Sequence, residues 1–409
     1  MATPDARTGP ILRRVALALV VLLGTLATVL PQSGLAQGNP PPGFTETVVA
    51  SNLGAPTALA VVPNGHANAG AIYVASQDGT LGLVPAAGGP PETAFAFANA
   101  CDGSEQGLLG VALDPAFAGN DRVYVYLTER RGNACANRVY RFVANPDGTL
   151  DPGSRKRLLS TAKLGPTNHN GGDIAFGADG FLYVSIGENA RPDLAQARNT
   201  LFGKIVRITT DGKAPRSNPF AGRKTSARCA VTGKTNGKKR CAEIFALGLR
   251  NPFRIAFESG SNRFFINDVG QNAWEEIDRG ARGANYGWPE REGPCRRGNG
   301  APTCPGTNRF VGPVYAYNRD DGCVTITGGA FVPGNAGWGS RSGNYLYADF
   351  GCETIFALSD PFGANPSSST FATGVGMIVA LQFDPTTPGT LLYTTHSDDG
   401  EVRRISPNP

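Results

Sequence analysis

Two short polar motifs contain the side chains best suited to catalysis. His169 lies in TNHNGGD, directly before an apolar run, and the chain has three histidines in all. A neutral imidazole is a competent general base near pH 7. Arg250 lies in GLRNP, also before an apolar run, and its guanidinium suits a carboxylate or a quinone oxygen. The alternatives are a structural or merely exposed histidine and a surface arginine in a salt bridge.

A third motif, DVGQNAWEEI, supplies oxygen ligands. Gly270 allows backbone carbonyls to approach a ligand closely. Glu275 and Glu276 carry the hard carboxylate oxygens that calcium binds. The alternative is a surface loop with a capped turn, because the same residue types gather in turns.

Six copies of one pattern position these motifs. Each copy has an apolar strand, a turn rich in Asp, Pro, Gly or Asn, and a second strand centred on an aromatic residue. A third strand-like run usually follows. The pattern predicts an all-β fold, a six-bladed β-propeller of four-stranded antiparallel blades, with a pair of β-sandwich sheets as the alternative. The copies span residues 58–76, 110–127, 173–187, 254–268, 329–349 and 380–396.

The N-terminus is typical of a secretory signal. Arg13 and Arg14 precede an apolar run, and small residues end at Ala36, where we expect cleavage. An uncleaved membrane anchor is the alternative. We therefore predict a signal peptide over residues 1–36, a Pro-rich linker over 37–43 and the propeller over 44–409. The protein is expected to be periplasmic or secreted, with no membrane association after cleavage.

The charge of the chain is modest. The net charge is +5 for the full chain and +3 without residues 1–36, which is too small to indicate a nucleic-acid partner. The basic run at 234–240 lies in a Gly/Thr/Asn-rich insertion. We interpret it as a solvated loop.

Eight cysteines follow the signal segment. In an oxidising compartment they predict disulfides. No CxxC or Cys/His spacing favours a metal site instead. Proximity in the sequence suggests the pairs Cys101–Cys135, Cys229–Cys241, Cys295–Cys304 and Cys323–Cys352.

GLRNP, DVGQNAWEEI and GANYGWP, with GSEQGLLGVALDP near residue 105, resemble motifs of the glucose/sorbosone dehydrogenase family. That family includes soluble PQQ-dependent aldose dehydrogenases and hedgehog-interacting-protein-like propellers, and the resemblance covers nearly all of the chain after Ala36. It implies a six-bladed propeller, PQQ and Ca²⁺ as cofactors, and an aldose sugar as substrate. By this resemblance His169 removes the C1 hydroxyl proton while hydride leaves C1 for PQQ, and the product is the lactone.

The same resemblance assigns the other site residues. It implies that the carbonyls of Gly270 and Gln271 hold the calcium associated with PQQ. It also implies a second, structural calcium at Glu276 and the carbonyl of Tyr286. The cofactor contacts that it implies are Glu105, Arg250, Asn251, Gly270 and Gln271.

The last blades depart from the family pattern. Related sugar dehydrogenases hold the PQQ carboxylates with basic side chains from these blades, but segments 348–356 and 374–383 contain no Lys or Arg. Burial of a tricarboxylate requires compensating cations. Loop arginines that could contribute are Arg191, Arg319 and Arg341.

Two other functions remain open from the sequence. GCVTITGG and DFGCE resemble the hedgehog-interacting-protein-like branch, which favours a non-catalytic, calcium-bearing propeller that binds carbohydrate or protein. A metal-dependent lactonase would need carboxylate-rich metal ligation at the central opening. The motifs do not specify the natural electron acceptor.

Overall fold

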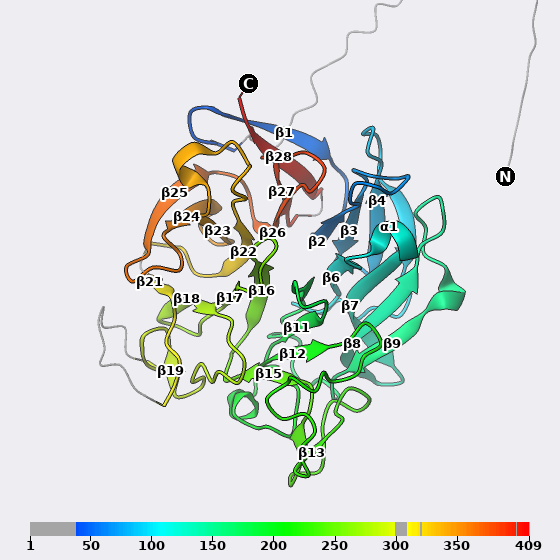
Figure 1. Ribbon diagram of the computed structural model, residues 1–409, viewed down its shortest axis with the longest axis vertical. Coiled ribbons are helices and arrows are strands. Elements are labelled where there is room, and N and C mark those ends of the chain that lie inside the picture. The colour runs from blue at the N-terminus through cyan, green and yellow to red at the C-terminus, as the bar shows by residue number, and fades with distance from the viewer. Residues whose placement is uncertain (1–37, 299–308, 320, 398, 409) are drawn as a thin grey trace, which may run out of the picture. The chain divides into compact units, whose positions relative to one another are not determined.

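Six four-stranded antiparallel sheets form a ring of blades in the computed structural model (Figure 1). The structure describes residues 38–408, except 299–308, 320 and 398. The first two blades contain β2 (Pro56–Val61), β3 (Ile72–Ser76), β4 (Thr80–Val84) and β5 (Glu92–Ala96), then β6 (Leu108–Leu113), β7 (Arg122–Arg131), β8 (Ala134–Val143) and β9 (Lys156–Ser160). The next two contain β10 (Ile174–Phe176), β11 (Leu182–Ile186), β12 (Lys204–Ile208) and β15 (Ile244–Leu247), then β16 (Pro252–Phe257), β17 (Phe264–Asp268), β18 (Trp274–Arg279) and β21 (Tyr315–Asn318). The last two contain β22 (Ile326–Phe331), β23 (Tyr345–Asp349), β24 (Thr354–Ser359) and β25 (Ser367–Thr373), then β26 (Ile378–Phe383), β27 (Leu391–Thr395), β28 (Glu401–Pro407) and β1 (Phe44–Ala50).

This architecture confirms the predicted six-bladed propeller. Each predicted repeat supplies the first two strands of one blade. The second strands, such as β11 and β17, are buried at every position, because neighbouring blades cover both faces of each sheet. The described helical turns are α1 (Phe117–Asn120), η1 (Pro152–Ser154), η2 (Pro192–Ala195) and η3 (Gly339–Arg341).

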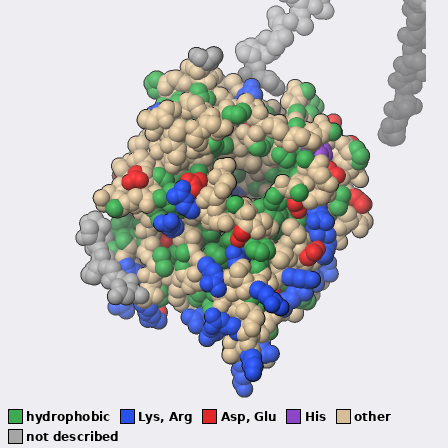
Figure 2. Space-filling model, in the orientation of Figure 1, with side chains coloured by type: hydrophobic (Ala, Val, Ile, Leu, Met, Phe, Trp, Pro, Cys, Tyr) green, Lys and Arg blue, Asp and Glu red, His purple; other side chains and the backbone are tan. Residues whose placement is uncertain are grey.

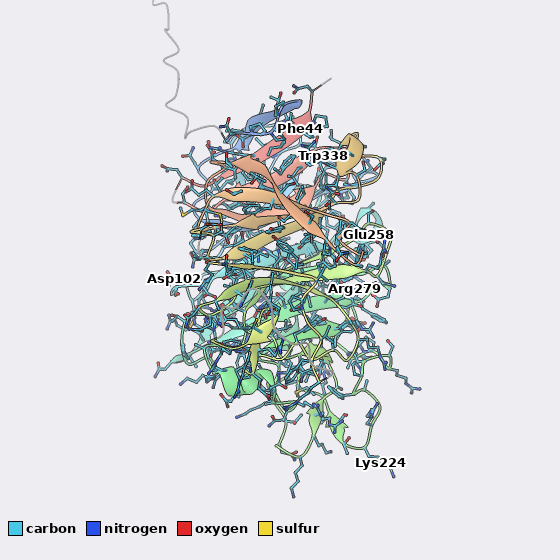
Figure 3. The ribbon with its side chains drawn as sticks, turned by 90° about the vertical axis from the view of Figure 1, so that its left-hand side faces the viewer. Phe44, Asp102, Lys224, Glu258, Arg279 and Trp338 are labelled. Carbon is cyan, nitrogen blue, oxygen red and sulfur yellow. A yellow bond between two sulfur atoms is a disulfide. The ribbon has the colours of Figure 1, made fainter. Side chains whose placement is uncertain are left out.

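Strand β1 closes the ring. It pairs antiparallel with β28, from Phe44 opposite Pro407 to Ala50 opposite Val402. The Phe44 ring lies 4.8 Å from that of Trp338 in the preceding blade (Figure 3). The predicted propeller begins at this strand, but its place as the outer strand of the sixth blade was not predicted from the sequence.

The ring has two functionally different ends. The loop before β6 contains Asp102, and the turn after β16 contains Glu258; these residues lie on opposite sides of the ring (Figure 3). The turn end has a cavity of about 660 Å³ lined by the first strands of the blades and their turns. Figure 2 shows this face, hollowed near its centre. The residues predicted to form the site lie in loops at the other end.

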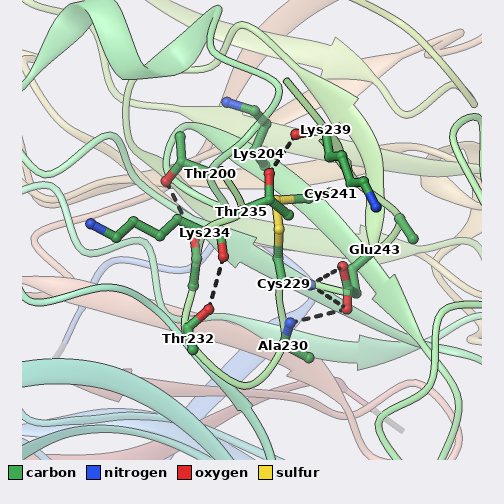
Figure 4. Close-up of a disulfide and its surroundings, with 12 residues drawn as sticks. Thr200, Lys204, Cys229, Ala230, Thr232, Lys234, Thr235, Lys239, Cys241 and Glu243 are labelled. Carbon is green, nitrogen blue, oxygen red and sulfur yellow. Dashed lines mark hydrogen bonds between the residues drawn. A yellow bond between two sulfur atoms is a disulfide. The ribbon is translucent and has the colours of Figure 1, made fainter. Parts of the chain in front are cut away.

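The long insertion between β12 and β15 is pinned by the Cys229–Cys241 disulfide (Figure 4). Buried Glu243 accepts the backbone N–H groups of Cys229 and Ala230 at 3.0 Å each. The Lys and Arg side chains around β13 gather on the surface (Figure 2), and residues 234, 238 and 239 are exposed. The short strands of the insertions are β13 (Ser226–Ala227), β14 (Arg240–Cys241), β19 (Arg291–Glu292) and β20 (Cys295–Arg296).

Three of the predicted disulfides are confirmed: Cys101–Cys135, Cys229–Cys241 and Cys323–Cys352. The predicted partner of Cys295 is Cys304, which lies outside the described residues, as does the predicted signal peptide. Within the described ranges, no helix has the length and hydropathy needed to cross a membrane.

Candidate functional site

Loops from three consecutive blades meet at one end of the ring. In an antiparallel blade, the start of the first strand and the end of the second lie at the same edge. Glu105, His169 and Arg250 precede the first strands β6, β10 and β16. Glu188 and Gln271 follow the second strands β11 and β17. The topology therefore brings these five side chains to one opening.

His169 forms a dyad with Glu188. Its Nδ1 lies 2.8 Å from Oε1 of Glu188, and its Nε2 lies 2.8 Å from Nη2 of Arg250. A guanidinium can only donate, so Nε2 is the acceptor and Nδ1 carries the hydrogen that is donated to Glu188. His169 is buried, with φ of 55°. This tautomer leaves the basic lone pair on Nε2, which is the arrangement a general base requires.

Arg250 is the central cation of the site. Its Nε and Nη2 donate to Oε1 of Gln271 at 3.0 and 2.8 Å, and Nη1 donates to the carbonyl of Val269 at 2.8 Å. Burial lowers the pKa of Arg250, and Asp268 opposes this effect. The guanidinium makes no ion pair with a carboxylate among the described residues. It is therefore positioned to receive an anionic group.

Glu105 and Asn251 hold the His169 loop in place. Oε2 of Glu105 accepts the backbone N–H of His169 at 2.8 Å and Nδ2 of Asn251 at 3.0 Å. Oδ1 of Asn251 accepts the backbone N–H of Gly171 at 3.0 Å. Both were predicted as cofactor contacts; what the structure shows is that both join loops of different blades.

The Gly270–Gln271 loop wraps around a carboxylate. Oε1 of Glu292 accepts the backbone N–H groups of Gln271, Asn272 and Ala273 at 2.8, 2.7 and 2.8 Å. A Cβ atom at Gly270 would lie 1.6 Å from the Trp274 carbonyl oxygen, so the loop requires glycine there.

One of the two carbonyls predicted to hold calcium in this loop already has a partner. The carbonyl of Gln271 accepts Nη1 of Arg319 at 2.8 Å. Arg319 therefore places a positive charge at one predicted calcium ligand. Of the other loop arginines, Arg191 stacks on Phe202 beside the site, with Cζ 4.9 Å from the ring centroid. Arg341 belongs to η3 in the β22–β23 turn, at the opposite end of the ring, so its expected contribution to the site is wrong.

A cavity of about 560 Å³ opens among these loops. This volume lies within the range of small-molecule sites, roughly 300–1,000 Å³. Both residues of the His169–Glu188 dyad line this cavity, and so do the side chains of Arg250 and Arg297. The lining side chains that matter below are His169, Glu188, Arg250, Gln271, Glu292 and Arg297.

Three carboxylates cluster next to the site. One oxygen from each of Asp268, Glu276 and Asp278 lies within 4.8 Å of the others. Asp278 is fully buried, and neither of its oxygens has a hydrogen-bond partner among the described residues. Burial and the neighbouring acids raise the pKa of Glu276 well above its usual range, and burial raises that of Asp268 to about 7. Such a cluster fits a hard divalent cation, which would neutralise the carboxylates.

The cluster is joined to the site through Asp268. Its carboxylate accepts the backbone N–H groups of Arg250 and Asn251 at 2.9 and 2.6 Å. Tyr286, whose backbone carbonyl is the other predicted ligand, is buried, and its side-chain hydroxyl donates to the carbonyl of Arg279 at 2.7 Å. Glu275 instead forms an ion pair with Arg319 of its own blade at 3.0 Å. Its Oε2 accepts the backbone N–H of Ile326 in the next blade at 3.0 Å, so it links two blades and stays out of the cluster.

Several residues at this end of the ring were not predicted from the sequence. Glu188 directly follows the second strand of its blade, and a search for acids at such strand ends would have found it. Asp268 and Asp278 lay within or beside a recognised motif. Strand pairing places Asp268 opposite Glu276, and Asp278 lies on the same face of β18 as Glu276, two residues along the strand. Glu292 and Arg297 belong to an insertion that had no assigned role.

Comparison with known proteins agrees with the fold and the motifs. The family model described as "Glucose / Sorbosone dehydrogenase" matches residues 53–361. Aldose sugar dehydrogenase YliI of Escherichia coli is 30% identical over 243 residues, covering 59% of this chain and 61% of that protein. HIPL1 protein of Arabidopsis thaliana is 28% identical over 313 residues, covering 60% of this chain and 43% of that protein. The chain thus spans 43 to 61% of the length of these relatives.

A solved structure gives the same result. The PQQ-bound form of aldose sugar dehydrogenase from Streptomyces coelicolor superposes with a TM-score of 0.70 and 26% identity, covering 90% of this chain and 99% of that one. The family match includes the three motifs that build the site. This chain is therefore a member of the glucose/sorbosone dehydrogenase family.

Proposed function

We propose that the protein is a PQQ-dependent aldose dehydrogenase that oxidises the sugar at C1 to the lactone. The observation that carries this proposal is the Glu188–His169 dyad beside a guanidinium, in a cavity of suitable size. The PQQ-bound relative from Streptomyces coelicolor supports the choice of cofactor. The disulfides support an oxidising compartment, periplasmic or extracellular.

The site offers a buried cation to the negatively charged PQQ. The buried guanidinium of Arg250, which has no carboxylate partner in the described ranges, is a cation for a ligand carboxylate or quinone oxygen. Asn251 and Gln271 would complete the contacts of the cofactor. Calcium would be held by the carbonyl of Gly270 near the cofactor and by Glu276, Asp268 and Asp278 in the carboxylate cluster. PQQ, when bound, supplies the acceptor for the C1 hydride.

His169 acts on the sugar hydroxyl. Its Nε2 takes the C1 hydroxyl proton once that hydroxyl replaces Nη2 of Arg250 as the hydrogen-bond donor. The Nδ1–H bond to Glu188 holds the ring and stabilises the imidazolium that forms. Glu105 holds the backbone of His169 toward the cavity, and Arg250 orients the sugar oxygen as its negative charge develops.

The test is reconstitution with PQQ and Ca²⁺, followed by dye reduction with aldoses. His169→Asn suits the left-handed backbone at this position, which asparagine tolerates. We expect kcat to fall at least about 100-fold, with PQQ binding, measured by absorbance titration, retained. His66→Asn is the matched control, because its ring contacts Asp121, outside the site. Equal activity in His169→Asn and wild type contradicts the proposal.

A second function is favoured by the last blades. Segments 348–356 and 374–383 contain no Lys or Arg, and the relatives include HIPL1 protein. The second candidate is a calcium-bearing propeller that binds carbohydrate or protein without oxidation. It predicts no PQQ uptake at micromolar concentration, while Ca²⁺ still raises the melting temperature.

A further inference from the structure

The β19–β20 hairpin forms one wall of the cavity that contains His169. It belongs to the insertion that follows the GANYGWP motif. Glu292 from β19 and Arg297, directly after β20, both line the cavity. Neither residue is needed for the proton transfer described above.

Glu292 has one satisfied and one unsatisfied oxygen. The residue is 3% exposed, and Oε1 accepts the loop N–H groups described above. Oε2 is buried and has no hydrogen-bond partner among the described residues. A buried carboxylate oxygen without a partner is destabilising. Glu292 lines the cavity, and a ligand hydroxyl would satisfy this oxygen once the side chain turns toward the cavity; sugars offer such hydroxyl donors.

Arg297 contributes an exposed cation to the cavity wall. Its side chain is exposed and makes no ion pair in the described part of the chain. Its Cζ lies 5.3 Å from the Trp288 ring centroid, and the Cζ of Arg250 lies 5.7 Å from the same ring. Both arginines also line the cavity, so an anion placed there is attracted to two cations. The hairpin therefore supplies a position for a carboxylate.

We propose that Glu292 and Arg297 form a substrate subsite for a sugar that bears a carboxylate, so that the preferred substrate is an aldose acid such as a hexuronate. This inference rests on the proposed function, which places C1 at His169. Arg297 pairs with the sugar carboxylate, and Glu292 accepts a ring hydroxyl between the two ends. The negative charge of Glu292 repels the carboxylate of the sugar. The sugar therefore binds with its carboxylate at Arg297.

The experiment compares glucuronate with glucose. In the PQQ-loaded protein we expect Arg297→Gln to lower the ratio of the two kcat/KM values about tenfold, the size of a lost charge-assisted hydrogen bond. Arg297→Lys should retain part of the preference. Arg296→Gln is the matched control, because Arg296 is the exposed neighbour that does not line the cavity; its ratio should equal that of wild type. Melting temperatures establish that the variants are folded.

Calorimetry on the protein without PQQ separates this inference from the proposed function. Glucuronate should bind more tightly than glucose, and Arg297→Gln should remove that difference even if no sugar is oxidised. An equal loss in Arg296→Gln overturns the subsite, because the effect would then come from diffuse charge. Weaker PQQ binding in Arg297→Gln with an unchanged sugar ratio also overturns it, because Arg297 would then serve the cofactor carboxylate.

Discussion

Oε1 of Glu188 lies 2.8 Å from Nδ1 of His169. The β10–β11 hairpin connects the two residues, because it starts beside His169 and returns to the same edge of the blade at Glu188. The contact determines which ring nitrogen carries the hydrogen, and the first prediction tests it.

Replacement of Glu188 by glutamine should lower kcat about 100-fold. The amide keeps the shape of the side chain but cannot stabilise the imidazolium that forms on proton transfer. PQQ affinity should stay unchanged, since Glu188 contacts the histidine in this scheme. Glu258→Gln, in the turn at the other end of the ring, is the control. If both variants lose activity equally, Glu188 has no special role.

Calcium should act through the carboxylate cluster. In wild type, chelation should lower the melting temperature, because three acids then share one buried space. Asp278→Asn removes a ligand and also a repulsive charge. The variant should therefore be more stable than wild type under chelation and gain less from added Ca²⁺. Thermal unfolding with EGTA or Ca²⁺ measures both effects, and an equal gain in the two proteins would exclude Asp278 as a ligand.

Ring closure should depend on Phe44. Its ring contacts Trp338 and Phe371, with centroids at 4.8 and 5.4 Å. Phe44→Ala should lower the free energy of unfolding by about 1–3 kcal/mol, less than for a fully buried phenylalanine. Val48 lies in the same strand and is 50% exposed, so Val48→Ala should change little. Urea denaturation compares the two variants, and similar values for both would argue against β1 as the closing strand.

The loss of folding stability at low pH should depend in part on Glu129. Burial raises its pKa, but hydrogen bonds from Tyr140 at 2.6 Å and Arg155 at 2.7 Å outweigh burial and hold the pKa below its usual range. A lowered pKa in the folded state contributes stability above the unfolded pKa of about 4.3. That contribution is lost as the pH falls through the folded-state pKa.

Glu129→Gln tests this dependence. The variant should be less stable than wild type at pH 7, by about 1–3 kcal/mol, and the difference should shrink toward pH 3. Urea denaturation across this range is the measurement. A difference that is the same at pH 3 and pH 7 would show that the charge of Glu129 has no part in stability.

Much of the architecture was predictable because its signals are local. The repeated strand–turn–strand pattern indicated six blades, and proximity in the sequence suggested three cysteine pairs that the structure confirms. His169 and Arg250 each precede the first strand of a blade. In a closed ring of blades, this position puts both residues at the same end.

The sequence by itself determined the blades and the loops that carry the polar motifs, because strand periodicity and turn composition depend on neighbouring residues. Only the tertiary structure decided which side chains meet. Glu188 reaches His169 through hairpin pairing, and Asp268 lies opposite Glu276 through strand register. Strand β1 reaches β28 from the other end of the chain. These contacts join residues that are distant in sequence, and their geometry follows from how the blades stack around the ring.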